Sequence, residues 1–314
     1  MLSRRLIRIK VFKVLFSNVT AGDVTLKSAQ NELMLSCEKT QELSMFMLNV
    51  AIALKNAAEA KIELGLKKFK PTPEEASPNR KFAENKFVQL LLENEEFLKY
   101  CQNRGLIWND ELLIYVRKLF NEISQKEYFQ EYMNSGESSF EEDCNIFSRI
   151  FEEEFEDSEE LYSFLEDMSV YWIDDIDYVL NIILRIITSV KKDKKFSIPS
   201  IFIKEDDKEY AIQLLDYSLT NYQSLLAEVS KNISNWDSER LVATDITIII
   251  EGIAEAIKFP SIPIKVTINE YVEISKFYST PNSKTFVNGL LDKIIQQKVK
   301  DGEIVKSGRG LIEA

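Results

Sequence analysis

Five basic side chains lie within the first thirteen residues, a segment without a single acidic residue. They are Arg4, Arg5, Arg8, Lys10 and Lys13. Guanidinium and ammonium groups bind phosphate oxygens, so this terminus has the chemistry of a nucleic-acid-binding surface. Cations in the first turn of a helix oppose its macrodipole, at a cost of up to about 1 kcal/mol that an anionic partner would offset. The segment therefore predicts an anionic partner.

The same segment carries an apolar stripe at helical spacing, with Arg4 and Arg8 one turn apart beside it. The stripe consists of Ile7, Val11, Val14 and Leu15. A disordered basic tail would not need such a stripe. We therefore expect one helix that docks through its apolar face and displays its arginines.

The chain contains no histidine. This removes the commonest general base near neutral pH, the commonest metal ligand and every Ser-His or Cys-His nucleophile. Carboxylates at Asp174, Asp175 and Asp177 have a spacing that suits a helix start or turn as well as acid–base work. We predict no enzymatic activity, no cofactor and no metal centre, with a loose divalent-cation site on the acidic segment as the open alternative.

Cysteine usage and hydropathy indicate the compartment. Cys37, Cys101 and Cys144 are far apart and form no CxxC pair, which favours buried thiols in a reducing environment. No stretch approaches the roughly 20 apolar residues that span a bilayer. The expectation is a soluble cytoplasmic protein without a membrane partner.

Composition favours an all-α fold. Of 314 residues, 45% are hydrophobic and only nine are Gly and seven Pro, while apolar residues recur at three- and four-residue intervals. Two or three helices fit residues 26–69, and the prolines of residues 70–87 mark an exposed connection. A second break at residues 191–209 places the start of a C-terminal unit near Asp206.

The acidity is confined to one insert. Residues 137–177 hold sixteen acidic side chains and the single base Arg149, so of the formal charge of −12 the insert carries −15 and the rest of the chain +3. Within it, residues 152–160 alternate carboxylates with aromatic residues at helical spacing, which is typical of a solvated helix face. The net charge of the whole chain therefore does not argue against nucleic-acid binding by the residues outside the insert.

Three separated segments resemble one family. Residues 262–294, IPIKVTINEYVEISKFYSTPNSKTFVNGLLDKI, are similar to the C-terminal signature of NusB proteins, P-x-K-V-A-I-N-E-A-V-E-L-A-K-x-F followed by S-x-x-F-V-N-G-V-L-D. Upstream, Trp236, Arg240, Asp245 and Glu255 match the family in order, and residues 3–16 parallel its arginine-rich first helix.

The resemblance implies a helical bundle of the NusB type with an extra helical insert, as in the long forms of Bacteroidetes-type bacteria. The implied division has four parts: an arginine-rich first helix of the NusB core at residues 1–17, an additional helical region with the acidic insert at 18–205, the NusB C-terminal core at 206–301 and a flexible tail at 302–314.

The resemblance also implies a function: transcription antitermination, by binding a single-stranded boxA-like element of nascent ribosomal RNA together with the ribosomal protein NusE, within a complex that contains RNA polymerase. The residues carried over as RNA contacts are Arg4, Arg5, Arg8, Asn282, Lys284 and Phe286. Phe16 and Asp245 match positions on the side of the protein partner. A ring such as Phe286 could stack on a base, although a place in the core fits it equally well.

Three features depart from the family pattern: Ile9 stands where an acid is usual, Lys13 where Gln is usual, and the arginine common inside the helix that Asp245 begins is absent. The alternative hypothesis is a helical adaptor that keeps the NusB fold, has lost RNA binding, and uses its acidic insert to hold another protein.

Overall fold

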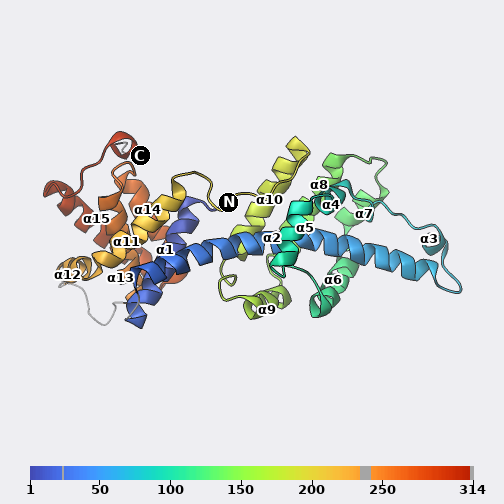
Figure 1. The fold of residues 1–314 in the computed structure, drawn as a ribbon, viewed down its shortest axis with the longest axis horizontal. Helices are drawn as coiled ribbons and strands as arrows, with labels where there is room; N and C mark the ends of the chain where they lie inside the picture. The colour runs from blue at the N-terminus through green and yellow to red at the C-terminus, as the bar shows by residue number, and fades with distance from the viewer. Residues whose placement is uncertain (23–24, 234–241, 312–314) are drawn as a thin grey trace. The chain divides into compact units, whose positions relative to one another are not determined.

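The computed structural model describes residues 1–22, 25–233 and 242–311, and its regular elements are helices (Figure 1). The prediction of an all-α protein is confirmed. Within these residues, extended pairing is limited to one isolated bridge between Leu2 and Phe202. None of the helices in the described ranges is both long and apolar enough to cross a membrane.

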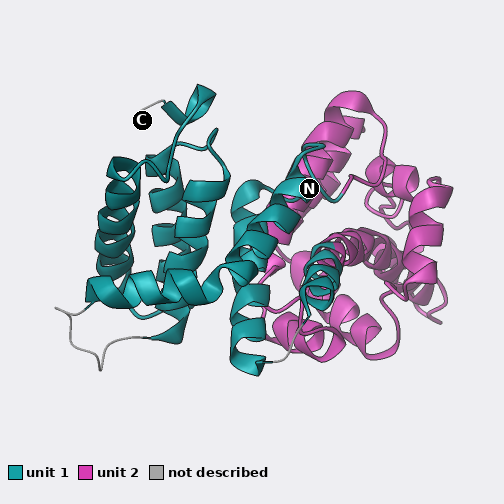
Figure 2. Cartoon of the chain, turned by 60° about the vertical axis from the view of Figure 1, so that its left-hand side comes forward, with its two compact units in different colours: residues 1–37, 201–314 teal, residues 38–200 magenta. Residues whose placement is uncertain are grey.

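The chain divides into two compact units, shown in Figure 2. Unit 1 comprises Met1–Cys37 and Ile201–Ala314, and unit 2 comprises Glu38–Ser200. The division falls inside a single helix, α2 (Leu26–Leu66), rather than in the proline-containing segment after it. We expected two or three helices there, but residues 26–66 contain no proline and only Gly65, near the end, to weaken the helix.

Unit 1 is organised around one buried helix, α13. Its other helices, apart from the first turns of α2, all pack on α13. The helices are α1 (Arg4–Ala21), α11 (Asp207–Thr220), α12 (Tyr222–Ile233), α13 (Ala243–Lys258), α14 (Ile264–Tyr278) and α15 (Ser283–Lys300), with a 3-10 turn at Gly308–Leu311. A helix that is apolar nearly all round is stable only inside a core, which explains the central place of α13.

The first helix begins where the sequence predicts. Ser3 caps α1, its hydroxyl accepting a hydrogen bond from the Leu6 amide, and α1 ends at Gly22, whose φ of 90° suits glycine. The whole predicted stripe, from Ile7 to Leu15, is buried. Buried residues also lie beyond that stripe, at Arg8 and Lys10 among others, so α1 is embedded more deeply than one apolar face requires.

Unit 2 is a second helical assembly around the later part of α2. Its helices are α3 (Pro73–Ala76), α4 (Lys86–Leu92), α5 (Glu95–Asn103), α6 (Asp110–Ile123), α7 (Glu127–Asn134), α8 (Phe140–Glu153), α9 (Glu159–Met168) and α10 (Ile176–Asp193). The acidic run is interrupted, because α8 ends at Glu153 and Ser158 caps α9. Phe151 and Phe155 are buried beside the exposed carboxylates, as the spacing predicts.

Candidate nucleic-acid interface

Arg4 and Arg5, at the start of α1, are held at the surface of unit 1 by carboxylates. Arg4 donates to Asp206 at 2.8 Å and to Asp207 at 3.0 Å, at the start of α11. Arg5 donates two hydrogen bonds of 2.9 Å to Glu270 of α14, in the bidentate geometry that guanidinium and carboxylate favour. Both guanidiniums remain partly exposed, at 29% and 48% of their side-chain surface.

Arg8 lies in the core instead. Its side chain is 4% exposed, and its Nε and Nη2 donate to the two oxygens of Glu255 on α13, at 2.6 and 3.2 Å. Its Nη1 lies 3.4 Å from Glu270, which thereby joins Arg5 and Arg8. Burial alone would lower the pKa of Arg8, but Glu255, Tyr210 and Tyr271 together outweigh it, so the pKa is raised.

A buried polar network continues from this ion pair. Tyr210 and Thr267 also donate hydroxyl hydrogen bonds to Glu255, so both carboxylate oxygens are fully used. One turn earlier on α13, Glu251 is buried and accepts from Tyr271 at 3.1 Å. Burial, together with the nearby charge of Glu255, raises the pKa of Glu251 well above its ordinary value, which favours its neutral form.

This placement changes the role of one predicted contact. We expected Arg4, Arg5 and Arg8 to meet RNA phosphates together, but Arg8 cannot reach a surface phosphate in this conformation because its guanidinium is enclosed and saturated by carboxylates. Its structural effect is to tie α1 to α13 and α14. Arg8 therefore positions the first turn of α1, where Arg4 and Arg5 lie.

The three positions predicted near the start of α15 are placed differently from one another. Asn282 is the exposed N-cap residue and makes no side-chain capping bond. Lys284 is exposed and has neither a hydrogen bond nor an ion pair to any residue in the described ranges. Phe286 is half-buried. Because the first turn of α15 contains no acid, its amide dipoles and Lys284 together favour an anion there.

Helix α14 connects the arginines at the start of α1 with the residues at the start of α15. Arg5 of α1 pairs with Glu270, and further along both helices the Phe12 and Tyr278 rings pack 5.5 Å apart, so α1 and α14 run in the same direction. The eight residues from Glu270 to Tyr278 correspond to about 12 Å of helix. Lys13 lies over the Tyr278 ring, 5.4 Å from its centroid. Arg5 and Lys13 thus place basic side chains at both ends of the edge that α1 and α14 form between Glu270 and Tyr278.

Two further residues near these groups are not among the predicted RNA contacts. Lys13 lies between the predicted groups, and its place among the N-terminal basic residues was the available signal. Phe277 is 76% exposed at the end of α14, and no motif singled it out. An exposed ring of this kind is suited to stacking on an unpaired base.

The predicted partner-side residues also differ in exposure. Phe16 is half-buried, with its ring 6.1 Å from that of Phe12. Asp245 is 2% exposed and accepts a hydrogen bond of 2.8 Å from Ser283, the first residue of α15. Through this bond Ser283 links α15 to α13. The matched positions Trp236 and Arg240 lie outside the described residues.

Within the described ranges, no three acidic or cysteine side chains converge as metal ligands would. The site offers hydrogen-bond donors, cations and aromatic rings at a surface, set on a buried ionic scaffold. Exposed cations and hydrogen-bond donors of this kind suit contacts to the phosphates of an anionic polymer.

Comparison with known proteins identifies the family. The NusB family matches residues 190–296, a range that contains α11 to α14 and nearly all of α15. This chain is therefore a NusB-family protein, and it carries a large additional helical unit. The predicted family membership is confirmed.

Curated relatives support the same assignment. The chain is 33% identical over 130 residues to the transcription antitermination protein NusB of Chloroherpeton thalassium, covering 40% of this chain and 62% of the relative. It is 36% identical over 105 residues to NusB of Salinibacter ruber, covering 33% and 66%. For NusB of Thermodesulfovibrio yellowstonii the identity is 36% over 94 residues, covering 30% and 62%. The chain thus spans slightly under two thirds of these relatives, and no solved structure matches it.

Proposed function

We propose that this chain is a non-enzymatic transcription antitermination factor that binds a boxA-like element of nascent ribosomal RNA together with NusE. The observation that carries the proposal is the NusB match over residues 190–296, since the relatives named above are all transcription antitermination proteins. The setting that follows is a cytoplasmic complex with RNA polymerase.

The RNA surface that we propose runs from Arg4 and Arg5 along α14 to Asn282 and Lys284. Exposed ion pairs contribute only about 0–1 kcal/mol each, so RNA phosphates can replace the Asp206 or Glu270 partner at small cost. Lys284 needs no such exchange. Phosphate contacts of this kind position the RNA, while exposed base edges and stacking give sequence preference.

Stacking has two candidate rings. Phe286 remains a proposed contact, but its half-buried ring presents only part of a face. Phe277, at the end of α14, presents most of its surface. For NusE, we keep Phe16 as a proposed contact. Asp245 is better suited to acting through Ser283, by fixing the start of α15.

One observation favours the alternative of a helical adaptor without RNA binding. All three predicted arginines already have carboxylate partners within unit 1, and these acids also repel phosphate. An adaptor would retain the NusB fold as a scaffold and engage a protein through the acidic insert.

A transcription assay separates the two functions. RNA polymerase would transcribe a template that carries a boxA-like leader upstream of a terminator, with the full chain and NusE added separately and together. We expect read-through that requires both proteins and the boxA-like leader. Equal read-through with the boxA-like leader and with a scrambled leader would support the adaptor. Read-through that the chain does not change in the presence of NusE would support it too.

A further inference from the structure

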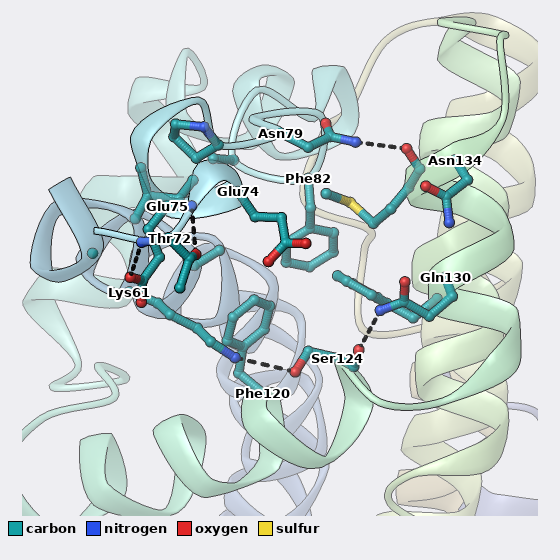
Figure 3. Close-up of a pocket in the computed structure, with 17 residues that line it drawn as sticks. Lys61, Thr72, Glu74, Glu75, Asn79, Phe82, Phe120, Ser124, Gln130 and Asn134 are labelled. Atoms are coloured by element: carbon teal, nitrogen blue, oxygen red, sulfur yellow. Dashed lines mark hydrogen bonds between the residues drawn. The ribbon is translucent and has the colours of Figure 1, made fainter. Parts of the chain in front are cut away.

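Unit 2 contains a pocket whose residues are not part of the proposed RNA surface. It lies between the later part of α2, the short helix α3 and helices α6 and α7 (Figure 3). Its volume is about 540 Å³, within the range of roughly 300–1,000 Å³ that small-molecule sites occupy.

Aromatic rings form one side of the pocket. Phe82 packs against Phe129 with centroids 5.0 Å apart and against Phe120 at 5.7 Å, and Met133 completes this wall. The three phenylalanines are each at most 6% exposed, so close packing holds the rings and only small parts of them face the pocket. Such a surface suits an aliphatic stem, and the negative face of an aromatic ring attracts a cation.

Most hydrogen-bond donors of the lining are already engaged. The Lys61 ammonium donates to Asn121 at 3.0 Å and to Ser124 at 3.3 Å. The side-chain amides of Asn79 and Gln130 donate to main-chain oxygens at 2.7 and 2.6 Å. The polar capacity left for a ligand therefore consists largely of acceptors.

One acceptor carries a full charge. Glu74 has no hydrogen bond or ion pair to any other described residue, and Figure 3 shows its carboxylate extended into the pocket near Phe82. Its neighbour Glu75 is occupied, because it accepts from Lys68 and from the Thr72 amide in the capping box of α3. The capping box fixes α3, and so holds the backbone from which Glu74 extends.

We propose that this pocket binds an organic cation, an ammonium or guanidinium group on a short aliphatic stem. The head group lies against the Glu74 carboxylate, and the stem packs along Phe82, Phe129 and Met133. The cation is a free small molecule or a lysine or arginine side chain of another protein. An anionic ligand fits less well, because Glu74 would repel it and Lys61 has little donor capacity left.

Nuclear magnetic resonance of methyl-labelled methionine tests the proposal on the full chain. Met133 lines the pocket, and the other five methionines serve as internal references. The probe is butylguanidinium, with the isosteric neutral compound butylurea as its control. We expect a saturable shift of the Met133 methyl signal with butylguanidinium and about threefold weaker binding of butylurea, since the charged pair with Glu74 is exposed to solvent.

Two variants complete the test. Glu74→Gln keeps the shape of the side chain and removes its charge at an exposed position, and should weaken the binding of butylguanidinium about threefold. Glu63→Gln makes the same charge change on α2 outside the pocket and should leave the binding unaltered. Equal binding to Glu74→Gln and wild type, equal binding of butylurea, or no shift at millimolar probe would overturn the proposal. A Gly-Gly-Arg-Gly-Gly peptide that binds more tightly than butylguanidinium indicates a protein side chain as the source, and weaker binding indicates a free small molecule.

Discussion

Replacing Arg8 by alanine tests whether this residue is structural. In the wild type its guanidinium and Glu255 are enclosed together, with nitrogen–oxygen distances of 2.6 and 3.2 Å and side-chain exposures of 4% and 0%. Arg8→Ala leaves the carboxylate buried without its counter-charge. Removing one partner of a buried ion pair costs about 3–5 kcal/mol. We expect the lower end, about 3 kcal/mol, since Tyr210 and Thr267 still donate to Glu255.

Native-state hydrogen exchange of the α13 amides, followed by mass spectrometry, measures this loss within unit 1 alone. This matters because a chain of two units need not unfold in one step. The matched control is Arg5→Ala, which removes a half-exposed pair and should cost at most about 1 kcal/mol. Adding Glu255→Gln to Arg8→Ala should recover part of the loss, because it removes the uncompensated charge.

A small effect would refute the reasoning. If Arg8→Ala changed the opening free energy of α13 by no more than Arg5→Ala, the Arg8–Glu255 pair would not be a structural element. Arg8 would then be available for direct phosphate contact, as the sequence first suggested.

Three further predictions follow from single residues. Burial raises the pKa of Glu251, so the folded protein keeps this proton at pH values where the unfolded chain loses it. The stability that the buried neutral carboxyl contributes is therefore full below about pH 4 and falls as the pH rises. Glu251→Gln should raise the urea midpoint more at about pH 8 than at about pH 5, and an equal gain at both pH values would contradict this. Lys284→Ala should lower the slope of log Kd for RNA against log salt by about 1, whereas Lys300→Ala, at the far end of the same helix, should leave it unchanged; equal slopes for wild type and Lys284→Ala would exclude the phosphate contact. Burial raises the pKa of Cys101 and Cys144 to about 12, so iodoacetamide should label them slowly in the native protein and quickly in denaturant; fast native labelling would show that these thiols are accessible.

Local patterns predicted much of the fold. The apolar stripe in α1 depends on residues close together in sequence, and the structure contains it. The length of α2 was missed because the number of helices within an apolar segment depends on what packs along it. The division of the chain inside α2 has the same cause: long-range contacts set it, and no composition change marks residue 38.

The partners of the arginines could not be predicted for a similar reason. Charge and spacing identified Arg4, Arg5 and Arg8 as a group, but their exposure depends on Glu255 and Glu270, about 250 residues away in sequence. Both glutamates lie in the segments that resemble the NusB pattern, yet nothing in that pattern says which of them is buried. Only the packing of α1 against α11 and α13 distinguishes a surface arginine from a core one.

Fluorescence anisotropy of a labelled boxA-like RNA tests the central claim most directly. Wild type and an Arg4→Ala, Arg5→Ala, Lys284→Ala triple variant, which spares the buried Arg8, would be titrated at one stated salt concentration, with and without NusE and against a scrambled RNA. We predict that the wild type prefers the boxA-like RNA, that NusE tightens its binding, and that the triple variant loses most of its affinity while remaining folded. Equal binding of both RNAs in the presence of NusE would contradict the account.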